Sequence, residues 1–81
     1  MRYIEAMSEL DRITHIPDIM GGKPTIRGMR VTVGMIVEEV AGGTTPEQLL
    51  EAFPYLERED ITQALRYAAW MVQGRDVDVT A

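Results

Sequence analysis

The sequence contains no cysteine and only one histidine among its 81 residues. Without cysteine the chain cannot form a disulfide framework, a thiolate zinc site or a cysteine nucleophile. The single histidine, His15, cannot form a metal site alone, and no serine or carboxylate stands in a context typical of a catalytic triad or a carboxylate pair. We therefore expect a protein that has no cofactor and is not an enzyme.

Long apolar runs are also missing. No run approaches the roughly 20 residues that a membrane-spanning helix needs, and the N-terminus lacks the basic and then apolar pattern of a secretion signal. These absences predict a cytoplasmic protein. The composition, 46% hydrophobic and 26% charged, is typical of a folded globular chain. A domain of this size buries only about 60% of the surface of its unfolded chain, so we expect it to gain stability by forming an oligomer.

Basic residues are scarce in the second half of the chain. The net charge is −5, which disfavours strong nonspecific attraction to phosphate backbones. Residues 1–31 hold five basic residues against four acids, whereas the chain from Val33 onward holds three against nine. A DNA-binding surface would therefore draw on the N-terminal half, and the acidic half would suit a cationic partner.

The N-terminal half is predicted to contain an arm and a short β region. Residues 1–12 form a short helix or a loosely packed arm. In residues 13–32, β-branched residues alternate with glycine and proline, which favours short strands and turns. We expect turns at Gly21-Gly22 and Gly28-Met29 and an extended segment from Pro24. Such short strands are stable when they pack on helices or pair with a second copy, which predicts a homodimer.

The region 33–73 is predicted to form three helices, followed by a tail at residues 74–81. The first helix has Thr32 as its N-cap, buries Ile36, Val37 and Val40, and ends at Gly42-Gly43. The second begins with Thr45-Pro46-Glu47-Gln48, a capping box with proline at the first helical position. It buries Leu49, Leu50 and Phe53 and must end at Pro54.

The third helix, from about Glu57 to Val72, shows the longest helical period in the chain. An apolar stripe is formed by Ile61, Ala64, Leu65, Ala68 and Val72. The opposite face is predicted to be polar, with Glu59, Thr62, Gln63 and Arg66, and to be flanked by Tyr67 and Trp70. Such a face suits contacts with bases and phosphates or with a protein partner.

Three short helices, with a turn at Pro54-Tyr55-Leu56 before the last, predict a mainly α fold of the helix-turn-helix type with a short N-terminal β-hairpin. In that motif the last helix enters the major groove. The acids Glu57, Glu59 and Asp60 at its start would face phosphates of the same sign, which counts against this function. The candidate DNA-binding residues are Lys23, Arg27, Arg30, Arg58, Thr62, Gln63 and Arg66.

The order of the motifs resembles the domain of unknown function 433 (DUF433) family. The similarity rests on residues 22–33 (GKPTIRGMRVTV), 43–47 (GTTPE) and 53–56 (FPYL). It continues through 59–61 (EDI) and 64–69 (ALRYAA). Ile13-Thr14, Pro17, Ile19 and Ile36 also match. The run from Gly22 to Arg30, followed by the Glu-Asp-Ile segment, is specific to this family.

The resemblance implies a homeodomain-like helix-turn-helix domain that acts as an antitoxin in a bacterial type II toxin–antitoxin pair. Its partner would be a PIN-like nuclease encoded by the adjacent gene, and it would also repress the shared operon. The candidate toxin-binding residues are Arg66, Trp70 and Arg75, with Arg75 reaching the metal-binding acids of the nuclease. The chain departs from the family at Glu57, where members often have Thr or Ser, and this loss of a cap weakens the case for DNA reading.

Two other functions fit the same residues. One is a stand-alone transcriptional repressor that uses the helix-turn-helix and the basic residues of the β region. The other is a small dimeric interaction module in which the helices only support the β region.

Overall fold

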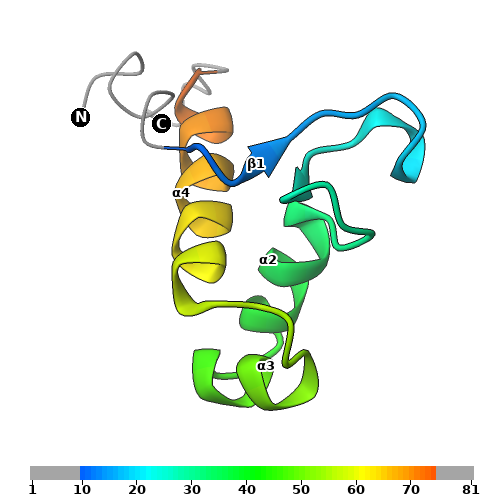
Figure 1. The fold of residues 1–81 in the computed structure, drawn as a ribbon. Coiled ribbons are helices and arrows are strands. Elements are labelled where there is room, and N and C mark those ends of the chain that lie inside the picture. Colours follow the sequence, from blue (N-terminus) through cyan, green and yellow to red (C-terminus); the bar gives the residue numbers. More distant parts are fainter. Residues whose placement is uncertain (1–9, 75–81) are drawn as a thin grey trace, which may run out of the picture.

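The computed structural model describes residues 10–74 of the chain. The predicted arm up to Glu9 and the tail from Arg75 lie outside these residues. The described chain is mainly helical, with three α-helices and a short antiparallel strand pair, and this confirms the predicted fold class (Figure 1). Its elements are β1 (Ile13–Thr14), the 3-10 turn η1 (Met20–Gly22), β2 (Thr25–Ile26), α2 (Val33–Ala41), α3 (Pro46–Ala52) and α4 (Arg58–Gly74).

The two strands pair with Ile13 opposite Ile26 and Thr14 opposite Thr25. The hydroxyls of Thr14 and Thr25 lie 2.8 Å apart, so this pair is joined through its side chains as well as its backbone. The chain then reverses at Gly28 as predicted, and the Ile26 N–H donates to the Val31 carbonyl over 2.9 Å. Residues 13–32 thus form a short folded unit, which we call the N-terminal ribbon.

The reversal after β2 places two consecutive residues in the left-handed region. Arg27 has φ 47° and Gly28 has φ 71°, and the turn is closed by a 2.8 Å hydrogen bond from the Met29 N–H to the Ile26 carbonyl. Glycine adopts this conformation without strain, but arginine does not. The position of Arg27 therefore has to be held by other contacts.

The helix termini follow the capping signals of the sequence. The Thr32 hydroxyl accepts from the Met35 N–H over 3.0 Å and begins α2. The Thr45 hydroxyl accepts from the Gln48 N–H over 3.1 Å, and the Gln48 side chain accepts in return from the Thr45 N–H over 2.9 Å. These two predicted starts are confirmed, as are the ends of α2 before Gly42 and of α3 before Pro54.

The connection between α3 and α4 is longer than predicted. It spans residues 53–57 rather than three residues. Glu57 lacks a capping hydroxyl, but its backbone N–H donates to the Asp60 carboxylate over 2.8 Å. Asp60 thereby supplies one half of a capping box and keeps the start of α4 ordered.

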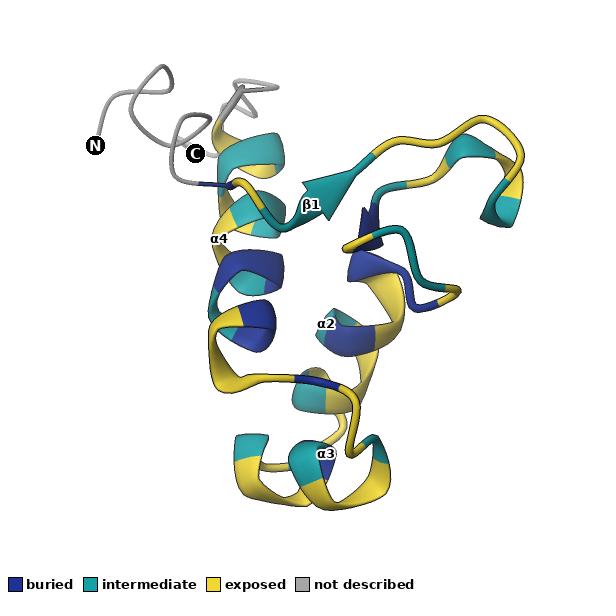
Figure 2. Ribbon diagram, viewed as in Figure 1, coloured by how far each residue is buried: buried dark blue, intermediate teal, exposed yellow. Residues whose placement is uncertain are grey.

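The core lies where α2 and α4 pack against each other, with α3 across one end and the N-terminal ribbon across the other (Figure 2). Its fully buried side chains include Ile36 of α2, Leu49 of α3 and Ile61 of α4. From the ribbon, Ile26 is buried completely. The ribbon is therefore part of the core and is not an independent hairpin.

One end of the predicted apolar stripe on α4 is not buried. Ile61 and Ala64 are in the core, but the Val72 side chain is 61% exposed. α4 has 17 residues and α2 has nine, so the last turns of α4 extend beyond the start of α2 (Figure 1). Within residues 10–74, none of the helices is long and apolar enough to cross a membrane.

Alanine substitutions at two glycines should have opposite effects on stability. A Cβ at Gly28 would lie 3.4 Å from Ile16 Cδ1 in a left-handed conformation, so Gly28→Ala should lower the free energy of unfolding by about 1–2 kcal/mol. Gly34 lies in the first turn of α2, and a Cβ there would meet nothing closer than 3.8 Å. Gly34→Ala should raise the stability by about 0.5–1 kcal/mol. Denaturant unfolding of both variants measures this, and equal effects would contradict the assigned backbone conformation.

Candidate functional site

A buried carboxylate lies between the N-terminal ribbon and α4. The side chain of Asp60 is fully buried, and it accepts two hydrogen bonds from Arg27, from Nε to Oδ1 over 3.0 Å and from Nη2 to Oδ2 over 2.8 Å. Arg12 Nη1 donates to Oδ1 over 3.0 Å. With the backbone N–H of Glu57, these contacts satisfy both carboxylate oxygens. We call Arg12, Arg27, Glu57 and Asp60 the Asp60 cluster.

A second set of hydrogen bonds surrounds this cluster. The Gln63 side chain is only 4% exposed, and its carbonyl accepts from the Arg12 backbone N–H over 2.9 Å. Its amide donates to Asp11 over 2.8 Å and to Glu59 over 3.2 Å. Arg27 also donates to the Tyr55 carbonyl over 2.9 Å. The cluster therefore joins the ribbon, the α3–α4 connection and α4.

These contacts change the ionisation of the groups involved. Burial raises the pKa of Asp60, but the hydrogen bonds from Arg27, the Glu57 N–H and Arg12 outweigh it, and the net pKa lies below its ordinary value of 3.8. The hydrogen bond to Asp60 raises the pKa of Arg27, and the bonds to Glu57 and then Asp60 raise that of Arg12. Asp60, Arg12 and Arg27 are thus ionised at neutral pH.

The structure corrects the placement of one predicted DNA-contacting residue, Gln63, and shows that another, Arg27, is paired. The Arg27 side chain remains 37% exposed, but its guanidinium binds Asp60 and Tyr55. Gln63 was expected on the outward face of α4, but it is buried because residues 11 and 12 cover that side of the helix. Both polar ends of the Gln63 amide are used by these neighbours, so helical periodicity alone assigned it to the wrong face.

The remaining predicted DNA-contacting residues are dispersed. Arg58 forms an ion pair with Glu47, and the Thr62 hydroxyl donates to the Arg58 carbonyl over 3.3 Å. The pairing with Arg58 lowers the pKa of Glu47. Lys23 and Arg30 are exposed on the ribbon, and Arg66 is exposed on α4. A role for these residues in DNA binding stays a prediction.

The predicted toxin-binding residues lie toward the C-terminal end of α4. Trp70 is half-buried, and its ring centroid is 5.7 Å from that of Tyr67. The Tyr67 hydroxyl in turn lies 3.0 Å from His15 Nε2. These three rings line a cavity of about 400 Å³ together with Leu10, Ile13 and Met71. Arg75 lies outside the described residues.

Sequence analysis missed a groove between α2, α3 and the α3–α4 connection. It has a volume of about 360 Å³, and its floor is formed by the buried side chains of Val31, Ile36, Leu49 and Leu56. Met35 and Phe53 form its walls, and Glu38 and Glu39 stand at its rim. We call this hollow the α2–α3 groove. A signal was present, because Met35, Glu38 and Glu39 fall on one face of a capped helix at helical spacing.

The chain belongs to the DUF433 family, whose family model, "Protein of unknown function (DUF433)", matches residues 13–68. The match covers the ribbon, the three helices up to Ala68 and, apart from Arg12, the Asp60 cluster. The family resemblance inferred from the sequence is therefore confirmed.

Two relatives illustrate the extent of the similarity. The chain is 46% identical over 56 residues to the uncharacterized protein y4eO of Sinorhizobium fredii (strain NBRC 101917 / NGR234), and the match covers 69% of this chain but only 25% of y4eO. The crystal structure of a DUF433 member from Anabaena variabilis ATCC 29413 superposes with a TM-score of 0.72 at 27% identity. That superposition covers 90% of this chain and 73% of the other.

Alanine substitutions at the two exposed arginines of the ribbon, Arg27 and Arg30, should differ sharply in their effect on stability. Arg27→Ala removes three hydrogen bonds to Asp60 and Tyr55, so its loss of unfolding free energy should be several times that of Arg30→Ala. Arg30 forms no ion pair within the described chain, and Arg30→Ala should change stability by less than about 0.5 kcal/mol. Denaturation midpoints at one protein concentration measure the difference. Equal losses would contradict the structural role of Arg27.

The lowered pKa of Asp60 predicts a loss of stability in acid. A carboxylate whose folded pKa lies below its unfolded value stabilises the fold fully above about pH 5, and this contribution is lost as the pH falls below 3.8 toward the lowered pKa. Asp60→Asn should cost about 3 kcal/mol at pH 7 because it breaks a buried charge pair. The difference in free energy of unfolding between wild type and Asp60→Asn should become smaller below pH 4. Glu51→Gln, at an exposed acid of α3, should have nearly the same free energy of unfolding as wild type at every pH. A difference between wild type and Asp60→Asn that does not change with pH would refute the lowered pKa of Asp60.

Proposed function

We propose that this chain is the antitoxin of a bacterial toxin–antitoxin pair and that it binds and inhibits a PIN-like nuclease encoded by the adjacent gene. The observation that carries the proposal is the accessible acidic surface of the helical half. Residues 33–74 contain seven acids and two basic residues, and six of the acids are exposed. These six are Glu38, Glu39, Glu47, Glu51, Glu57 and Glu59.

A nuclease that cleaves RNA needs a positive surface to attract the phosphate backbone. An acidic protein surface is complementary to such a site and competes with RNA for it. Arg75, at the start of the tail, remains the residue predicted to reach the metal-binding acids of the nuclease. The acidic face and Arg75 then have separate tasks, with the first docking on the RNA-binding surface and the second on the catalytic centre.

A binding function suits the described residues better than catalysis does. The carboxylate with the most strongly altered surroundings, Asp60, is ionised, buried and bound by two arginines, so it has neither the exposure nor the raised pKa of a general acid. His15 shares its hydrogen bond with Tyr67 and not with a nucleophile. DNA binding is disfavoured as the main function, because Arg27 and Gln63 form hydrogen bonds within the fold. Repression of its own operon would depend on Lys23, Arg30 and Arg66.

Co-purification tests this function. The untagged chain, expressed with the tagged product of the adjacent gene, should form a stable complex and suppress that product's RNA cleavage. A variant of the nuclease that lacks its catalytic acids serves as the control for toxicity, and it should still bind. If both forms of the nuclease fail to retain the chain at low salt, the antitoxin proposal is wrong. A mobility shift of the chain's own upstream DNA, which weakens steeply with salt, would then favour the stand-alone repressor.

A further inference from the structure

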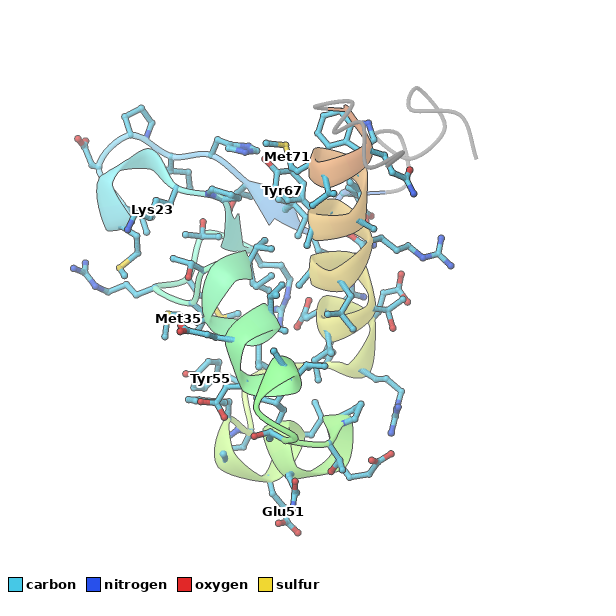
Figure 3. All side chains as sticks on the ribbon, turned by 180° about the vertical axis from the view of Figure 1, so that it is seen from behind. Lys23, Met35, Glu51, Tyr55, Tyr67 and Met71 are labelled. Carbon is cyan, nitrogen blue, oxygen red and sulfur yellow. The ribbon has the colours of Figure 1, made fainter. Side chains whose placement is uncertain are left out.

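The α2–α3 groove combines an apolar floor with apolar groups that remain open to solvent. Met35, on its wall, is 42% exposed although it is a large hydrophobic residue. Beside the groove, Tyr55 is 52% exposed, and its ring packs edge-on against Phe53 at a centroid distance of 6.0 Å. In Figure 3, Met35 and Tyr55 lie on the same side of the molecule. Contiguous apolar surface of this kind, framed by polar residues, is typical of interaction sites.

The rim of the groove carries negative charge that the fold does not neutralise. The Glu38 carboxylate makes no hydrogen bond or ion pair within residues 10–74, and the Glu39 carboxylate accepts only the Thr44 hydroxyl over 3.0 Å. Lys23 lines a neighbouring hollow with Met35 and Glu38 but forms no ion pair with Glu38 within residues 10–74, and Arg58 is already paired with Glu47. The two rim carboxylates are therefore available to a cationic group from outside.

We propose that the α2–α3 groove binds a basic amphipathic helix of the partner protein. Apolar side chains of that helix at positions i, i+4 and i+7 would enter the groove between Met35 and Phe53, and flanking lysines or arginines would pair with Glu38 and Glu39. α2, with nine residues, offers a wall about 13 Å long, which accommodates roughly two and a half turns of a docked helix. This inference rests on the proposed function, since it assigns the surface by which the chain holds its nuclease.

Charge argues for a foreign partner and against a second copy of this chain. Each helix of a second copy would bring acids of its own, because residues 33–74 carry seven acids against two arginines. Like charges facing each other across a contact are destabilising. Nucleic acid is disfavoured at the groove for the same reason.

The first test reverses one charge at two matched positions. Glu38→Lys changes the rim of the groove, and Asp18→Lys makes the same charge change at an exposed acid of the N-terminal ribbon, outside the acidic surface of the helices. Each variant is titrated against the tagged product of the adjacent gene by calorimetry. Glu38→Lys should weaken binding roughly tenfold or more, and Asp18→Lys by less than about threefold. Equal losses would refute the groove and leave the antitoxin proposal standing.

The second test removes apolar surface without disturbing the helix. Met35 is the third residue of α2, where glutamine can accept from the Thr32 N–H and complete a capping box. Met35→Gln should therefore preserve the melting temperature but weaken binding roughly tenfold. Val72→Gln, at an exposed apolar residue of α4 outside the groove, is the matched control and should bind as wild type does.

A third measurement keeps the inference testable if the adjacent gene product does not bind. A synthetic helical peptide of about 14 residues, with leucines at i, i+4 and i+7 and lysines elsewhere, is added to the full chain labelled with ¹⁵N. Amide shifts should concentrate at Met35, Glu38 and Phe53 and be lost in the Glu38→Lys variant. Shifts centred on Tyr67 and Trp70, or an equal response to a peptide with glutamates in place of the lysines, would overturn the proposed groove.

Discussion

The buried carboxylate of Asp60 holds together three parts of the chain that are distant in sequence. Arg12 reaches it from before β1, Arg27 from the turn after β2, and Glu57 from the connection that precedes α4. A buried ionised carboxylate is costly unless it is paired and fully hydrogen-bonded, so displacing any one of these segments would destabilise the fold. The same contacts hold Arg27 at φ 47°, a backbone conformation that arginine does not favour. The N-terminal ribbon is thus locked onto the start of α4 by a requirement of charge as well as by the burial of Ile26.

This arrangement determines which charges remain for partners. The cluster uses Arg12 and Arg27 inside the fold, and Glu47 uses Arg58 on the surface. The exposed acids of the helices are left in excess, and the helical half of the molecule presents a negative surface. That distribution supports the proposal of a cationic protein partner more strongly than it supports DNA. The arginines that stabilise the fold are thus engaged by its own carboxylates, and the exposed acids remain for a partner.

The shortness of α3 shapes the second surface of the molecule. Its seven residues cover the end of the α2–α4 pair and insert Leu49 into the core, but they leave Met35 and Phe53 open at the side. Pro54 prevents α3 from extending further because it cannot continue the hydrogen-bond ladder. Phe53 and Leu56, which follow the end of the helix, complete the lining of the groove.

Local signals in the sequence were sufficient for the secondary structure of the described chain. Thr32, the Thr45-Pro46-Gln48 box, Pro54 and Gly28 each act through partners within four residues, so their effects can be recognised without the fold. Periodicity also identified the core of α4, Ile61 and Ala64. It failed for Gln63, which was expected at the surface because burial of a polar group is costly. That cost is offset by a partner 51 positions away, and Arg27 likewise pairs with Asp60, 33 positions away. Such distant partners come together only once the chain has folded. The α2–α3 groove likewise depends on how the helices pack, which no local pattern specifies.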